Sequence, residues 1–250
     1  MTRNLIAALF IALLSGMRGN LNAQDTLFSN ILHSSDSAFS RNRGIGGGFM
    51  PGVIVLDMGP MRDLLNVVPQ LQGKSFGRLN SSRLLPVFIS GGMGYLGFDN
   101  GVRLGGVGMS GERSFTSDIY QQDSIMVMKV SVNYGGFLVD RAVSWDPFMV
   151  QTGMVVGGGS LSSSFCARSQ NAFSVFSRNT DSTEKTTYTA RFFLFELHGC
   201  CSYSIASFMH IGANVSLPMF FSADGFDAPT GSFMSANPAL QIRLIFGNLG

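Results

Sequence analysis

Polar and apolar residues alternate along several segments of the chain, most clearly near its C-terminal end. In residues 202–218, Ile211 and Val215 fall on one face of an extended strand, and His210 and Asn214 fall on the other. Successive side chains of a strand point to opposite faces of the sheet, so this period of two is typical of a strand with one apolar and one polar face. The pattern predicts β-strands, and it does not by itself say which face meets lipid.

The same reasoning places eight strands along the chain, with boundaries good to about two to four residues. They are 46–58, 86–98, 101–113, 124–138, 147–160, 187–199, 202–218 and 236–247. The connectors between them alternate between long and short, and Asp99-Asn100-Gly101 is a strong tight-turn signal. Such a rhythm, with strands long enough for the roughly 9–11 residues that cross a bilayer, is typical of a transmembrane β-barrel.

The long connectors are expected at the outer rim, with the short turns toward the periplasm. They are 59–85, 114–123, 161–186 and 219–235, while the connector 139–146 is expected to be a shorter one on the periplasmic side. In the first long connector, Met61, Leu64, Leu65 and Val68 follow Pro60 at helical spacing. This spacing predicts a short amphipathic helix that caps or partly plugs the barrel.

Several strands carry charged and amide side chains opposite their apolar ones, and we expect these polar side chains to face the lumen. Charges away from water are costly unless they are paired, so they are predicted to interact with one another. The predicted lumen network consists of Lys129, Asn133, Glu196, His198, His210, Gln241 and Arg243. Residues 192–195 are apolar on both faces of their strand, which predicts that this segment is buried from both sides.

Glycines are concentrated in the hairpin of strands 86–98 and 101–113, where one glycine-rich segment recurs across the turn. This glycine patch consists of Gly91, Gly92, Gly94, Gly97, Gly105, Gly106, Gly108 and Gly111. Because glycine weakens a strand, the patch predicts tight bending of the wall or close approach by another element. Both copies match G-x-G-x-x-G, but a dinucleotide site needs a helix after that motif, so nucleotide binding is rejected.

The first 23 residues are predicted to be a secretory signal peptide. Arg3 supplies the positive start, Leu5–Leu14 the apolar run, and Ala23 the small residue before a cleavage point at Gln24. The alternative, a membrane anchor, would need about 20 apolar residues. Residues 24–43 are polar and are expected to form a flexible lead-in to a single barrel domain at residues 44–250.

Composition agrees with an exported protein that faces an apolar surrounding. Charged residues make up 13% of the chain, against about 25% in ordinary soluble domains. The net charge of +2 is too small to favour nucleic acid as a partner. The three cysteines, Cys166, Cys200 and Cys201, are expected to be unpaired thiols without the spacing of a zinc site. No catalytic, cofactor-binding or metal site is predicted.

Strand count, connector rhythm, signal segment and face alternation together resemble the small eight-stranded outer-membrane barrels of diderm bacteria. This class includes the membrane domain of OmpA and the OmpW type. The resemblance covers residues 44–250 and rests on no specific motif. It implies an all-β fold, a single antiparallel up-and-down β-barrel. It also implies contact with outer-membrane lipid and with the outer-membrane assembly machinery.

The role expected from this resemblance is non-enzymatic: structural, adhesive or concerned with a small solute. Two alternatives remain open. One is a soluble exported barrel or sandwich, periplasmic or secreted, that binds an apolar ligand or forms a surface assembly. The other is a lipid-modifying barrel enzyme that uses His198 or His210. Neither a cofactor nor a particular partner protein is indicated.

Overall fold

The computed structural model describes residues 44–68, 76, 82–98, 101–117, 124–169, 186–227 and 230–247. The predicted signal peptide and lead-in, residues 1–43, lie outside them. Among the described residues, no helix is both long enough and apolar enough to span a membrane.

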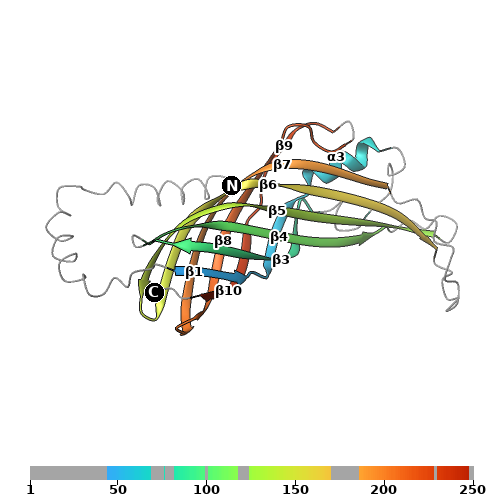
Figure 1. Cartoon of the computed structure of the whole chain (residues 1–250). Helices are drawn as coiled ribbons and strands as arrows, with labels where there is room; N and C mark the ends of the chain where they lie inside the picture. Colours follow the sequence, from blue (N-terminus) through green and yellow to red (C-terminus); the bar gives the residue numbers. More distant parts are fainter. Residues whose placement is uncertain are drawn as a thin grey trace. The chain divides into compact units, whose positions relative to one another are not determined.

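One helix and ten strands make up the described fold (Figure 1). In chain order they are β1 Gly44–Phe49, β2 Gly52–Asp57, α3 Gly59–Val67, β3 Leu84–Gly97, β4 Val102–Thr116, β5 Ser124–Trp145, β6 Phe148–Ser169, β7 Thr186–Ala206, β8 Met209–Ser222, β9 Phe233–Ala236 and β10 Ala239–Gly247. Two strand positions are interrupted: β1 and β2 both pair with β3 and β10, and β9 and β10 both pair with β8. Pro51 and Pro238 lie at the interruptions, because proline has no N–H to donate to a sheet.

The sheet closes on itself, since β1 pairs with β3 on one side and with β10 on the other. Every pairing is antiparallel, and with the two interrupted strands counted once each the ring has eight strands. The predicted fold class, a single antiparallel up-and-down β-barrel of eight strands, is therefore confirmed. At the predicted tight turn, Gly101 has a φ of 77°, which is the left-handed conformation that such a turn requires.

The predicted connector 139–146 is wrong. β5 continues to Trp145 and β6 begins at Phe148, so only Asp146 and Pro147 form the turn between them. Asp140 and Arg141 have the composition of a loop, but Asp140 is buried inside the barrel and continues the strand. The short connectors β3–β4, β5–β6 and β7–β8 lie at one end of the barrel, called here the turn side. The long connectors lie at the other end, called the loop side.

Three strands are much longer than a bilayer needs. β5, β6 and β7 have 22, 22 and 21 residues, about twice the 9–11 that cross a bilayer. On the loop side they continue past β3, and Figure 1 shows them reaching beyond it together with β4. We call this part the extension: residues 112–116 of β4, 124–133 of β5, 160–169 of β6 and 186–191 of β7.

The extension begins where β3 and β4 separate. Their pairing ends at Ile89 and Gly111, and beyond that point β3 pairs with β2 alone. Pro86 has no N–H to offer β4, and its carbonyl oxygen instead accepts a hydrogen bond from the Arg113 guanidinium. A proline thus marks the place where the barrel wall divides.

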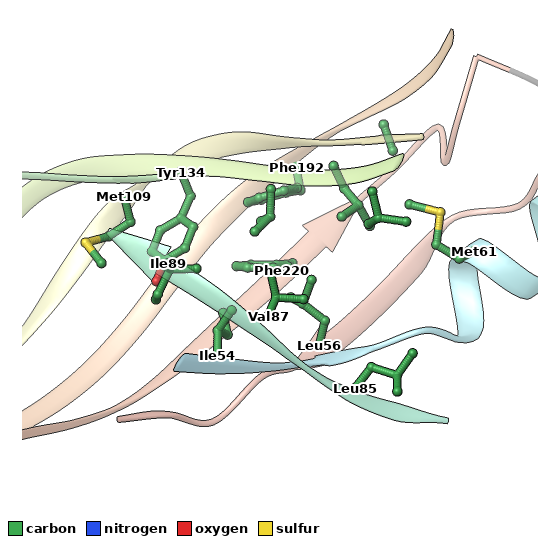
Figure 2. Packing of buried hydrophobic residues seen from close by; sticks show 14 of the residues in the cluster. Ile54, Leu56, Met61, Leu85, Val87, Ile89, Met109, Tyr134, Phe192 and Phe220 are labelled. Carbon is green, nitrogen blue, oxygen red and sulfur yellow. The ribbon is translucent and has the colours of Figure 1, made fainter. Parts of the chain in front are cut away.

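The loop-side half of the lumen is filled by apolar side chains (Figure 2). α3 is the predicted helix, with Pro60 in its first turn, and its Met61 and Leu64 are fully buried in this cluster. The Phe192 and Phe220 rings stack with their centroids 4.1 Å apart. The predicted two-sided burial of residues 192–195 is wrong for Phe193, which is 52% exposed on the outer wall.

Candidate functional site

The turn-side half of the lumen is polar, and its centre is an ion pair between neighbouring strands. Arg103 on β4 lies directly opposite Asp140 on β5. Arg103 donates from Nε to Oδ1 and from Nη2 to Oδ2 of Asp140, both at 2.7 Å. Both side chains are almost completely buried. Sequence reasoning missed this pair for two reasons. It ended the strand at Leu138, and the alternation that it used, with Lys129 and Asn133 in the lumen, would have placed Asp140 on the opposite face.

Two more side chains adjoin this ion pair. The Arg103 guanidinium lies over the Tyr95 ring, 4.2 Å from its centroid, which adds a cation–π contact. His198 Nε2 is 3.6 Å from Asp140 Oδ2, longer than an ordinary hydrogen bond. The group is therefore a buried ion pair flanked by an aromatic ring and an imidazole.

Hydrogen bonds connect a second set of lumen residues from β6, β7, β8 and β10. Arg243 donates to Gln151 at 3.3 Å, and Gln151 donates to Ser202 at 3.2 Å. Asn214 donates to Gln241 at 2.8 Å. Two arginines, Asp140 and Glu196 are all buried here, so the carboxylates match the guanidiniums in number. Arg103 and Asp140 form a direct ion pair, which offsets the cost of burying their charges.

Five of the seven predicted lumen residues lie inside the barrel, and two do not. Those inside are Glu196, His198, His210, Gln241 and Arg243. Lys129 and Asn133 are on the outer wall: Lys129 pairs with Glu112 at 2.5 Å, and Asn133 accepts a hydrogen bond from Ser110 at 2.7 Å. For these two the prediction is wrong, because inner and outer faces exchange polarity along β5.

The outer wall on the turn side carries a continuous apolar belt. On β8, Val215 is 62% exposed while its neighbours Asn214 and Ser216 are buried, and on β10 Leu240 is 60% exposed beside buried Gln241. The exposed apolar side chains of this belt are Ile45, Phe49, Val53, Phe88, Leu96, Phe98, Phe137, Trp145, Phe148, Val150, Met154, Val156, Phe193, Tyr203, Ile205, Phe208, Ile211, Val215, Leu240, Ile242 and Phe246.

Apolar outside and polar inside is the reverse of a water-soluble barrel. Aromatic residues gather at the turn-side edge of the belt, where Trp145, Phe148, Tyr203 and Phe208 are exposed. Outer-membrane barrels have an outward apolar band edged by aromatic residues and a closed sheet without unpaired edges at membrane depth. The chain is therefore a barrel that spans an outer membrane, and the apolar side chains on its turn-side wall face lipid.

Polarity reverses on the loop side of the belt. On β5, Met128, Val130 and Val132 point inward and are fully buried, while Lys129 and Asn133 point outward. Past Gly135 and Gly136 the same faces carry the opposite kind of side chain. The apolar Phe137 points outward, and the charged Asp140 points inward. The outer wall of the extension is thus the surface of a water-exposed sheet over an apolar core.

His198 lies beside groups that a hydrolytic site would use, but a substrate has no access to them. His198 lies beside Asp140 and opposite Ser216 on β8, which is an acid, imidazole and hydroxyl combination. The His198 and Asp140 side chains are both 0% exposed, so substrate cannot reach them in this conformation. Within the described ranges, no group of three His, Cys, Asp or Glu side chains could hold a metal ion.

The three cysteines are free thiols, as predicted. Cys200 is buried in the lumen, Cys201 is exposed on the outer wall, and Cys166 is half-buried. Cys200 and Cys201 are successive residues of one strand and point to opposite faces.

No protein-family model and no curated protein matches the chain. Among solved structures, it is similar to Ail, the attachment invasion locus protein of Yersinia pestis, at 10% identity and a TM-score of 0.36 over 82% of this chain and 96% of that one. Ail in complex with the heparin analogue sucrose octasulfate matches at 12% identity, with a TM-score of 0.37 and the same coverage.

Outer-membrane expressed OmpT of Vibrio cholerae matches at 11% identity, with a TM-score of 0.16 over 65% of this chain and 51% of that one. All three TM-scores lie below 0.5, so these similarities assign no ligand, partner or activity to this chain.

Proposed function

We propose that the chain is a non-enzymatic surface-contact protein, an outer-membrane barrel whose extension stands outside the cell and adheres to another surface. The observation that carries this proposal is the length and polarity of β5, β6 and β7. These strands are about twice as long as a bilayer needs, and their surplus has a polar outward face.

The outward face of the extension is rich in hydroxyl groups. On β6, Ser160, Ser162 and Ser164 point outward, and Ser162 hydrogen-bonds to Thr189 of β7 at 3.1 Å. A wide sheet face with many donors and acceptors and few charges suits contact with polar surfaces such as glycans or proteins. This face supports the adhesive role over a purely structural one.

A small-solute role is less well supported, because both halves of the lumen are filled. Arg103 is fully buried in the polar half, and Phe220, Ile54 and Met61 are fully buried in the apolar half. Eight strands enclose a lumen just wide enough for side chains. An enzymatic role lacks support because the best candidate group, around His198, is closed to substrate.

The adhesive role is tested with cells that display either the full chain or an outer-face variant. The variant Ser131→Glu, Ser162→Glu, Thr189→Glu adds charge to the extension without entering its core. Wild-type cells are expected to adhere to at least one immobilised glycan or matrix protein, and the variant to lose that adhesion at equal surface amount. Wild-type adhesion no greater than that of cells lacking the protein would contradict the role. Ion conductance by the purified barrel in a planar bilayer would instead support a pore.

A further inference from the structure

The glycines of the barrel wall fall into two groups with different surroundings. Inward glycines leave room for large lumen side chains. A Cβ on Gly46 would lie 2.5 Å from the Tyr95 hydroxyl oxygen, and one on Gly91 would lie 2.6 Å from Met109 Sδ. A Cβ on Gly159 would lie 2.6 Å from the Phe192 ring. At Gly91 and Gly159 the backbone oxygens of Gly108 and Asn133 on the neighbouring strands would be closer still. Lumen side chains and the backbone of adjacent strands together account for this group.

Most of the outward glycines have more open surroundings. Gly92, Gly108, Gly135 and Gly158 lie directly opposite one another across β3, β4, β5 and β6, in a row that we call the glycine trough. A Cβ on Gly108 would meet no atom within 4 Å, and one on Gly92 or Gly158 would meet a single backbone oxygen at 3.2 Å. Gly135 differs, because a Cβ there would lie 2.5 Å from the Val107 backbone oxygen, so contact within the wall accounts for this one glycine. Glycine weakens a strand and often marks close approach to its backbone, so a neighbour outside the wall would account for the trough.

A row of polar side chains lies beside the trough on its loop side. Ser90, Ser110, Asn133 and Ser160 are successive cross-strand partners, and we call them the polar row. These four side chains and Gly108 border an open hollow of about 520 Å³ on the outer wall. With both rows together, the hollow is polar on one side and free of side chains on the other.

A charged side chain lies next to the polar row, and exposed aromatic side chains lie next to the trough. Arg191 on β7 is exposed and lies directly opposite Ser160, at the end of the polar row. On the other side of the trough, Phe137 is 56% exposed. At the end of the trough, Phe193 lies directly opposite Gly158 and is 52% exposed. The hollow therefore stands where the lipid-facing belt gives way to the polar extension, with a cation at its polar end.

We infer that this hollow binds one anionic glycolipid of the outer leaflet. An acyl chain lies on the glycine trough and continues the contact of the belt with the bilayer, while the sugar head hydrogen-bonds to the polar row. A phosphate on that head pairs with Arg191. The bilayer brings lipid to this surface, and the match of apolar to apolar and cation to anion favours lipid over a second copy of the chain.

The inference is tested with the purified full chain in detergent by native mass spectrometry, using lipid A as the anionic glycolipid and phosphatidylethanolamine as the competitor. Wild type is expected to retain one lipid A in preference to phosphatidylethanolamine. Gly108→Leu fills the trough where there is space, and is expected to lower lipid A affinity about tenfold or more. Gly199→Leu is the matched control, because Gly199 is also outward on β7 and a Cβ there would meet no atom within 4 Å. This control is expected to bind lipid A as wild type does.

Arg191→Gln separates the headgroup from the acyl chain. It is expected to weaken binding of lipid A but not of its dephosphorylated form, and equal affinities of wild type and Arg191→Gln for lipid A would overturn the phosphate contact. Unchanged binding by Gly108→Leu, or a wild-type preference for phosphatidylethanolamine, would overturn the site. A wild-type dimer that Gly108→Leu dissociates would show that a second copy occupies the trough, which also overturns it. None of these outcomes depends on adhesion.

Discussion

The extension continues β4, β5, β6 and β7 beyond the belt, yet the inner and outer faces of these strands have opposite polarity in the two regions. On β6, outward Met154 and Val156 belong to the belt, whereas outward Ser160 and Ser162 belong to the extension. On the inner face of the same strand, buried Gln151 lies on the turn side and buried Phe165 on the loop side. The polarity of each strand face matches its surroundings. The position where polar and apolar side chains exchange faces therefore marks the boundary between lipid and water.

The largest effect is expected from the polar lumen of the belt. Asp140→Ala leaves the Arg103 guanidinium buried without its carboxylate, which is expected to lower the free energy of unfolding by about 3–5 kcal/mol. Urea unfolding in lipid vesicles, followed by intrinsic fluorescence, measures this loss. The double variant Arg103→Met, Asp140→Ala removes both charges and is expected to recover much of the stability. A double variant no more stable than Asp140→Ala would contradict the buried-charge explanation.

A matched pair of arginine substitutions compares the two outer walls directly. Val215→Arg places a charge in the lipid-facing belt and is expected to cost about 2–4 kcal/mol of unfolding free energy. Ser131→Arg places the same side chain on the outer wall of the extension and is expected to change it by no more than about 0.5 kcal/mol. The same vesicle unfolding assay serves for both. Equal costs at the two positions would mean that the two walls share one environment.

The smallest effect is expected from the ion pair on the extension. Lys129 and Glu112 are 44% and 62% exposed, and pairs in water are worth less than about 1 kcal/mol. Lys129→Gln is therefore expected to reduce stability only slightly, and the difference from wild type is expected to disappear in about 1 M salt. A loss comparable to that of Asp140→Ala, or one insensitive to salt, would show that Lys129 is not in water.

The sequence was sufficient for the order of the strands but not for their length. The alternation in residues 236–247, together with the Asn100-Gly101 turn, predicted β10 and the β3–β4 hairpin closely. The predicted strand 202–218 is wrong at its start, because β7 continues to Ala206 and the turn before β8 lies at Ser207 and Phe208. The length of β5 was missed because Asp140 and Arg141 have the polarity of a loop, and only the cross-strand partner Arg103 explains a buried aspartate there.

The lumen network was partly predictable for a related reason. Period-two alternation assigns residues to two faces of a strand, but it does not show which face points into the barrel. Gln241 and Arg243 were placed correctly because their strand lies in the belt, where polar means inward. Lys129 and Asn133 were misplaced because their strand segment lies in the extension, where polar means outward. Sequence spacing shows neither the register nor the depth in the bilayer, and both are needed to tell these cases apart.

The reversal of polarity on β6 can be measured directly with spin labels on outward positions. In a background with Cys166, Cys200 and Cys201 replaced, single cysteines at Met154, Val156, Ser162 and Ser164 carry a nitroxide in the vesicle-embedded barrel. Labels at the first two positions are predicted to be relaxed by oxygen, which concentrates in lipid, and labels at the last two by a water-soluble nickel complex. Nickel access at all four positions, or oxygen access at all four, would contradict a membrane boundary between Val156 and Ser162.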